Sequence, residues 1–182
     1  MRLLNQTPLF MIREGEQALD AALEKRGYQV IDPVNIYACP VDTLTDIPIP
    51  RVTVFAIWEP LAIMREIWAK GGIGPKRIDV MRRAGHPKTA LFGRINDKPA
   101  ATAFCGIFDG IAMLHALEVL PEQRRQGMAA WMMRKAAFWA KENGAKHLSV
   151  ICTQANAGAN GLYTSLGMTL VGQYHYRIWS DT

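Results

Sequence analysis

The sequence predicts an α/β protein in which helices flank a mixed, mostly antiparallel central sheet, with a small β-α-β extension at the N-terminus. Three consecutive segments of strand composition are joined by the short turns Asn96-Asp97 and Asp109-Gly110, which predicts antiparallel neighbours. A strand, an amphipathic helix and another strand follow, and such a crossover pairs strands in parallel. The apolar fraction of 49% and the charged fraction of 20% are ordinary for a globular protein of 182 residues.

Each element between residues 51 and 182 has its own local signal. The strands are rich in β-branched and aromatic residues, and Pro60 and Pro75 fit the first turns of two helices. Apolar residues spaced at i, i+3 and i+4 from Met128 onward predict the clearest helix, which Asn143-Gly144 ends. The predicted order is a strand at 52–58, helices at 60–70 and 75–83, strands at 88–95, 99–108 and 111–120, the helix from 128, a strand at 147–153, a helix at 157–166 and a strand at 168–179.

The first forty residues hold a smaller pattern of the same kind. A strand at 10–12, a helix at 16–26 capped by Gly27 and a strand at 28–38 repeat the order of elements that surrounds Gly167. The two units coincide without gaps at an offset of 140 positions, and a true repeat and a chance match both stay open. We divide the chain into an N-terminal extension at 1–40, a proline-containing linker at 41–50 and a main domain at 51–182.

The net charge of +5 is concentrated in residues 61–98, which hold nine basic and three acidic side chains. This segment is either a solvated helical face or a surface that attracts a polyanionic ligand. We expect no nucleic-acid binding, because neither interleaved aromatic residues nor a base-reading helix accompanies the charge. No apolar run reaches about 20 residues and the N-terminus lacks a secretory pattern, so we expect a cytoplasmic protein without membrane association.

The cysteines predict reduced thiols and no metal site. Cys39, Cys105 and Cys152 are widely spaced and lie in apolar contexts, which is typical of buried thiols in a reducing compartment. The histidines are scattered singly, and no cysteine or carboxylate accompanies them at the spacing that metal ligands need.

The stretch from Val119 to Ala129 is the most informative in the chain. A strand residue and Pro121 precede an Arg-x-x-Gly-x-Ala run that opens directly into the helix from Met128. Glycine permits the tight turn, and the first N–H groups of a helix have no partner within the helix. Because a helix N-terminus carries about half a positive charge, this turn predicts a binding site for a phosphate or pyrophosphate.

A second motif lies downstream, and the two together resemble the GNAT superfamily of acyl-CoA-dependent N-acyltransferases. Members carry Val-x-Pro-x-x-Arg-Gly-x-Gly-x-Gly and later Asn-x-x-Ala-x-x-Leu-Tyr-x-x-x-Gly-Phe. The matching positions here are Val119, Pro121, Arg124, Gly127 and Ala129, then Asn156, Ala159, Leu162, Tyr163, Gly167 and Met168. The resemblance covers about residues 51–182. It departs from the family at Arg125, where glycine is usual. It also departs after 168–179, where members often have a final strand that this chain lacks. We expect the N-terminal unit to cover the sheet edge that the missing strand would leave open.

The resemblance implies how acetyl-CoA would be bound. The backbone amides from Arg125 through Ala129 would cradle the pyrophosphate, and the backbone of Leu117 and Val119 would pair with the pantetheine arm. The expected cofactor-binding residues are Leu117, Val119, Arg124, Arg125, Gln126, Gly127, Met128, Ala129 and Asn156. The alternative roles are a helix N-cap for Asn156 and surface charge for the two arginines.

The resemblance also places Tyr163 near the thioester sulfur. A thiol has a pKa near ~8.5 and a phenol near ~10, so Tyr163 can protonate the leaving thiolate; a packing role is the alternative. The base that takes a proton from the amine is Glu118, His115 or neither, and we favour Glu118. Strict strand alternation places His115 with Leu117 and Val119, and Glu118 on the other face, unless a bulge intervenes.

The expected function is transfer of an acetyl group from acetyl-CoA to a primary amine, by direct attack through a tetrahedral intermediate. The acceptor is a small-molecule amine or a protein amine. The basic segment either favours an acceptor that bears a carboxylate or phosphate or attracts only the 3′-phosphate of CoA. A non-catalytic acyl-CoA-binding or sensor module is the alternative. A homodimer is compatible with both functions.

Overall fold

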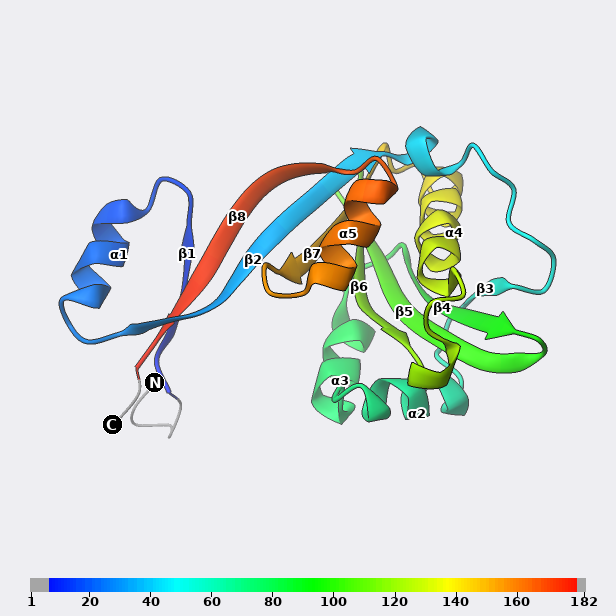
Figure 1. Cartoon of the computed structure of the whole chain (residues 1–182), viewed down its shortest axis with the longest axis horizontal. Helices are drawn as coiled ribbons and strands as arrows, with labels where there is room; N and C mark the ends of the chain where they lie inside the picture. Colours follow the sequence, from blue (N-terminus) through cyan, green and yellow to red (C-terminus); the bar gives the residue numbers. More distant parts are fainter. Residues whose placement is uncertain (1–6, 180–182) are drawn as a thin grey trace.

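The strand segments assemble into one eight-stranded sheet in the computed structural model, which describes residues 7–179 (Figure 1). The strand order is β1-β8-β2-β7-β6-β5-β4-β3. The neighbours β6 and β7 are parallel, and the other neighbouring strands are antiparallel. The predicted α/β class, with a mixed and mostly antiparallel sheet flanked by helices, is confirmed.

The elements follow the local signals of the sequence. The strands are β1 (Leu9–Arg13), β2 (Gln29–Pro40), β3 (Val54–Ile57), β4 (Lys88–Ile95), β5 (Lys98–Phe108), β6 (Ile111–Val119), β7 (His147–Thr153) and β8 (Thr169–Ile178). The helices are α1 (Gln17–Glu24), α2 (Ala62–Lys70), α3 (Pro75–Arg83), α4 (Met128–Glu142) and α5 (Ala157–Ser165). The strand predicted from residue 52 begins later, because Val52 lies in a turn with a φ of 61°. Within residues 7–179, no helix is both long enough and apolar enough to cross a membrane.

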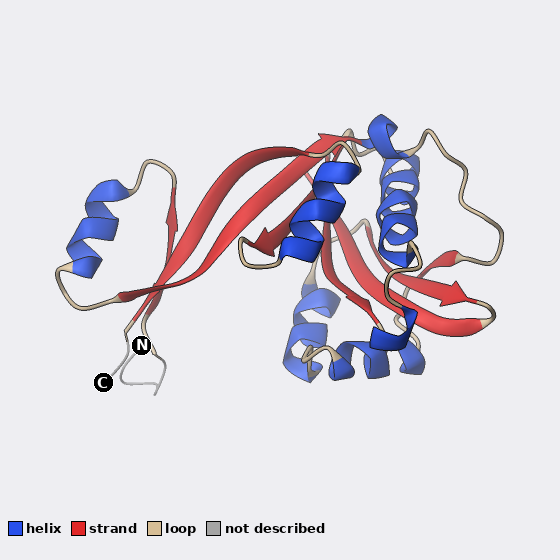
Figure 2. Ribbon diagram, in the orientation of Figure 1, coloured by secondary structure: helices blue, strands red, loops and turns tan. Residues whose placement is uncertain are grey.

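Helices cover both faces of the sheet (Figure 2). On one face α4 and α5 pack into the larger core, where Met132 and Met133 are fully buried. On the other face α2 and α3 form a second core around the fully buried Trp68. The missing side chain of Gly93 lets α4 approach β4, since a Cβ there would lie 2.5 Å from the sulfur of Met128.

The N-terminal unit is woven into the sheet. β2 lies between β7 and β8, and β1 pairs with the other edge of β8. The crossover through α4 joins the parallel neighbours β6 and β7. The parallel pairing predicted for the strands on either side of α5 is wrong, because β2 lies between β7 and β8 and pairs antiparallel with each of them. We expected the N-terminal unit to cover the edge that the missing final strand would leave open, and the unit pairs with both edges of β8. The division of the chain at residues 40 and 50 stays a prediction.

The two β-α-β units pair with each other in a twofold-like arrangement. Gly27 and Gly167 both have positive φ angles, of 86° and 76°, just before β2 and β8. Ile12 of β1 lies opposite His175 of β8. When each residue is replaced by its equivalent 140 positions away, this pair becomes Cys152 and Asn35, which lie opposite each other on β7 and β2. The offset noted in the sequence thus relates strand register as well as element order.

The segment predicted as a linker packs against α4. Its 3-10 helix η2 (Val41–Leu44) buries Leu44 completely. Arg134 donates to the Leu44 carbonyl at 3.3 Å and pairs with Asp46, and Lys141 lies 2.7 Å from Asp42. These contacts tie the connection between β2 and β3 to the helix that follows the anion-binding turn.

Candidate active site

The turn between β6 and α4 presents a row of backbone amides. A short 3-10 helix, η3 (Pro121–Gln123), ends at Arg124, and Gly127 is the N-cap of α4 with a φ of 79°. The amides of residues 125–129 donate no hydrogen bond within residues 7–179. We call these five residues the amide cradle. They are the residues that the sequence predicted to bind a pyrophosphate, and free N–H groups at a helix N-terminus suit an anion.

Arg125 stands at the glycine place of the family pattern and adopts a conformation that glycine favours. Its φ is 63°, in the left-handed region. This conformation costs a residue with a Cβ roughly 1–2 kcal/mol. The exposed side chain forms no ion pair within residues 7–179. The substitution therefore keeps the positive φ of the turn and adds a guanidinium beside the amide cradle.

β6 and β7 separate halfway along β6, because their pairing stops after Leu114. The amide of Leu120 donates to β5 at 2.9 Å. Alternation along the strand therefore turns the backbone groups of Val119 and Leu117 away from β5, toward the open side. Arg124 Nε donates to the Val119 carbonyl at 3.0 Å. This edge thus offers strand backbone to an extended ligand, although one carbonyl already has a partner.

A β-bulge at Ala116 decides which face carries the candidate bases. Ala116 has a φ of 52°, and the pairing with β5 shifts there. Phe104 lies opposite His115, and Thr102 lies opposite Glu118. Since Thr102 and Phe104 are two residues apart on β5, their partners His115 and Glu118 share one face. Strict alternation, which would place Glu118 and His115 on opposite faces, is wrong at this point.

Helix α2 holds the bulge and contacts Glu118. Trp68 is fully buried, and its Nε1 donates to the Ala116 carbonyl at 2.8 Å. The helix ends at Gly71, where an added Cβ would lie 2.5 Å from Glu118 Cδ. The carboxylate therefore lies directly against the end of α2, and only glycine leaves room for it there.

The surroundings shift the pKa values of the two candidate bases in opposite directions. Burial raises the pKa of Glu118, and the positive charge of Arg124 partly opposes this. Burial lowers the pKa of His115, and the positive charge of Arg77 lowers it further. A carboxylate with a raised pKa is a stronger base, whereas an imidazole with a lowered pKa is a weaker one. Electrostatics therefore favour proton acceptance at Glu118 and oppose it at His115.

Tyr163 lies on α5 and is 6% exposed. Its ring packs against Tyr37 of β2, with ring centroids 5.6 Å apart. Burial raises the pKa of Tyr163 to about 12, and the nearby Cys152 contributes. Within residues 7–179 its hydroxyl forms no hydrogen bond. The phenol thus keeps its proton at neutral pH, and both the predicted acid role and a packing role fit this position.

A hydrogen-bond network around Asn160 was not foreseen from the sequence. Asn160 Oδ1 accepts from Asn35 at 2.8 Å and from the Tyr37 hydroxyl at 2.9 Å, and both donors belong to β2. Asn160 Nδ2 donates to the carbonyl of Thr153 at 3.1 Å. Asn156 is the N-cap of α5 and accepts from the helix backbone at 3.0 Å, so its alternative role is present. The partners of Asn160 lie 125 and 123 residues away, beyond the reach of local patterns.

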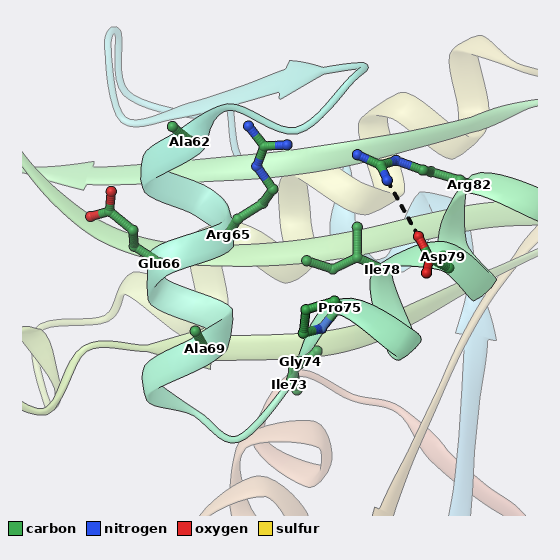
Figure 3. Close-up of a pocket in the computed structure, with 10 residues that line it drawn as sticks. All are labelled: Ala62, Arg65, Glu66, Ala69, Ile73, Gly74, Pro75, Ile78, Asp79 and Arg82. Carbon is green, nitrogen blue, oxygen red and sulfur yellow. Dashed lines mark hydrogen bonds and ion pairs between the residues drawn. The ribbon is translucent and has the colours of Figure 1, made fainter.

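A pocket of about 500 Å³ lies between α2 and α3, within the basic segment (Figure 3). Arg65 and Glu66 line it from α2. Asp79 and Arg82 line it from α3 and form an ion pair with each other at 3.3 Å. It shares no residue with the amide cradle. Within residues 7–179, no three histidine, cysteine or acidic side chains are grouped to hold a metal.

Comparison with known proteins supplies the family. The model described as "Acetyltransferase (GNAT) family" matches residues 58–168. The uncharacterized N-acetyltransferase YobR of Bacillus subtilis is 31% identical over 94 residues, which are 50% of this chain and 38% of that protein. The chain spans less than half the length of the curated relatives it matches.

Two solved structures share the whole fold at low sequence identity. A GCN5-related N-acetyltransferase from Kribbella flavida has a TM-score of 0.72 and 22% identity, covering 100% of this chain and 71% of its own. A tandem GNAT protein from the clavulanic acid biosynthesis pathway also has a TM-score of 0.72, with 12% identity, covering 98% of this chain and 65% of its own. The likeness therefore includes the N-terminal unit.

Proposed function

The chain belongs to the GNAT acetyltransferase family, and from this premise we propose that it transfers an acetyl group from acetyl-CoA to a primary amine. The course of β6 is the observation that carries the proposal. This strand leads into the amide cradle, presents backbone toward its open side, and places Glu118 against α2. In this proposal β6 carries the candidate base Glu118 and leads directly into the turn that binds the anionic acyl carrier.

The residues around the turn fit acetyl-CoA. The amides of residues 125–129 suit the pyrophosphate, and the guanidinium of Arg125 adds positive charge. The backbone of Leu117 and Val119 suits the amides of the pantetheine arm, as an added strand would. Asn156, at the start of α5, would contact the same arm. When bound, acetyl-CoA supplies an acetyl group activated as a thioester.

Glu118 and Tyr163 are proposed to move the two protons that the transfer requires. An amine with a pKa of about 8 to 10.4 arrives mostly protonated, and Glu118 takes a proton so that the nitrogen lone pair can bond to the acetyl carbon. As the carbon–sulfur bond breaks, Tyr163 donates its proton to the sulfur. The nitrogen loses its second proton after the attack, and this proton restores Tyr163 directly or through water. Glu118 then releases its proton to solvent, so that the net reaction yields the amide, the thiol and one proton.

We propose an acceptor that carries a carboxylate or phosphate beside its amine, on a small molecule or on a protein. The basic residues of α2 and α3 support this choice, because Arg77 acts electrostatically on His115, which shares a face with Glu118. Attraction between exposed charges weakens as salt increases. At saturating acetyl-CoA, the rate with an acidic acceptor should therefore fall with ionic strength, and the rate with a neutral acceptor should not.

A non-catalytic acyl-CoA-binding module is the second candidate, and two observations favour it. Tyr163 is almost completely buried against Tyr37. Arg124 already bonds the Val119 carbonyl that the pantetheine arm would use. A binding module would retain affinity for acetyl-CoA and release no thiol with any amine.

Calorimetric titration with acetyl-CoA and with CoA, followed by a thiol-release screen over an amine panel, tests the proposal. Micromolar binding with thiol release by at least one amine supports the transferase. Binding without release from small amines or from peptides with free N-termini and lysines supports the binding module. The absence of binding would refute the assignment of the amide cradle and both functions with it.

A further inference from the structure

Thr102 carries the only buried side-chain nitrogen or oxygen within residues 7–179 for which the structure has no hydrogen-bond partner. The residue lies on β5 and is 0% exposed. A buried hydroxyl without a partner is unfavourable, because it has lost its hydrogen bonds to water and gained none in return. Native structures satisfy nearly all such groups, so the hydroxyl of Thr102 points to an unrecognised partner.

Thr102 faces the same space as Glu118. The two residues lie directly opposite each other on β5 and β6, which places their side chains on one face with Cβ atoms about 4.5–5.5 Å apart. On the other side of Thr102, β4 contributes the apolar Phe92. Trp68 of α2 uses its N–H on Ala116 and has no acceptor to offer. The Glu118 carboxylate forms no hydrogen bond within residues 7–179, so both of its oxygens are free to accept one.

We propose that Thr102 is a positioning residue for the candidate base, whose hydroxyl donates a hydrogen bond to the charged carboxylate of Glu118. The catalytic meaning of this bond rests on the proposed function. Rotation about the side-chain torsions of Thr102 and Glu118 is enough to form the bond, while the backbone stays in place and Glu118 keeps its contact with the end of α2. The bond fixes the carboxylate on the face that the bulge assigns to it and favours its charged form.

The charges around this pair are few. Arg124 acts on Glu118 from the turn and also favours the charged carboxylate. His115 shares the face, and burial, with a smaller contribution from the positive charge of Arg77 of α3, lowers its pKa. Removal of the Thr102 hydroxyl leaves all three groups in place, so a change in the titration of Glu118 would report the hydrogen bond itself.

The test is an NMR titration of the full chain with ¹³C-labelled glutamate carboxyl carbons, in which Glu118→Gln identifies the Glu118 signal. Thr102→Val removes the hydroxyl and preserves the shape of the side chain, and Thr102→Ser keeps a hydroxyl. The midpoint of Glu118 should rise by about half a pH unit or more with valine and stay in place with serine. An unchanged midpoint with valine would overturn the proposal. Thr102→Ala gives the same readout if the valine variant does not fold.

The activity readout tests the positioning role separately. The acid limb of kcat/KM should move to higher pH in Thr102→Val, because the base must lose its proton before it can act. An acid limb that stays in place in an active variant would overturn the positioning role. The NMR titration needs no substrate, so failure of acetyl transfer would refute the proposed function and leave the measurement of the Thr102–Glu118 bond intact.

Discussion

Replacement of Gly71 by alanine should separate activity from stability. Gly71 ends α2 with a φ of −82° and a ψ of 7°, which alanine adopts without strain. The new Cβ would meet Glu118 Cδ at 2.5 Å, whereas ordinary contact begins near 3.4 Å. The carboxyl carbon must retreat by roughly 1 Å. The backbone can stay in place, because the clash is with the free end of a flexible side chain.

The displacement gives the expected size of the effect. A shift of roughly 1 Å at a catalytic group costs up to about 100-fold in rate, so kcat should fall about 10- to 100-fold. This loss corresponds to a barrier higher by about 1.4–2.7 kcal/mol. Alanine in place of glycine at a compatible position adds about 0.4–1 kcal/mol to the free energy of unfolding. The KM for acetyl-CoA should not change, because the amide cradle lies on another element.

The assay is steady-state thiol release at saturating acetyl-CoA, together with urea unfolding of the same samples. Gly85→Ala is the matched control, since a Cβ at Gly85 meets no atom within 4 Å and its φ lies outside the left-handed region. It should leave kcat within about twofold of the unmodified chain. Full kcat in Gly71→Ala would refute the role of Glu118 as the base. A loss of stability in Gly71→Ala would refute the claim that only the Glu118 side chain moves to make room for the new Cβ.

Three further predictions test other parts of the molecule. Tyr163→Phe should lower kcat by about 100-fold or more and keep the calorimetric affinity for acetyl-CoA, whereas equal rates would leave Tyr163 a packing role. The hydrogen bond from Arg177, and then that from His175, lowers the pKa of Asp20 to about 2, from 3.8 in the unfolded chain. This shift adds at most about 2 kcal/mol to the free energy of unfolding. The contribution is therefore complete above about pH 4 and is lost as the pH falls toward 2. Urea unfolding at several pH values should show this slope, and Asp20→Asn should remove it. Asn160→Ala leaves the donor groups on β2 without their acceptor and should cost about 2–3 kcal/mol in urea unfolding, and a loss below about 0.5 kcal/mol would contradict the network.

The turn and the helices could be predicted because their signals are local. Gly127 and the apolar spacing after Met128 determine the start of α4 within a few residues of chain. The positive φ of Arg125 could be expected only from the family pattern, since arginine by itself gives no such signal. Local chemistry therefore accounts for the helix start within the amide cradle and for the order of elements, and the family pattern accounts for the conformation of Arg125.

The features that complete the candidate site depend on contacts between distant segments. Ala116 carries no sequence signal for a bulge, so the shared face of His115 and Glu118 appears only when β5 is paired with β6. The place of β2 between β7 and β8 likewise requires the pairing of strands that are far apart in the chain. In the sequence, Thr102 is an ordinary strand residue. Only the structure shows that its hydroxyl is buried without a hydrogen-bond partner. Pairing and burial decide these roles, and neither can be read from a window of neighbouring residues.

The interleaving of β1 and β2 with β7 and β8 has a consequence for how the chain folds. The ion pair between Asp20 and Arg177 joins positions 157 residues apart, and contacts of such separation raise the contact order and slow folding. During synthesis, β1 and β2 leave the ribosome long before β7 and β8 exist to pair with them. Until then, Leu9, Met11 and Val30, which are partly exposed even in the finished sheet, lie on unpaired strands. The nascent chain should therefore depend on chaperone binding near its N-terminus until β8 has been made.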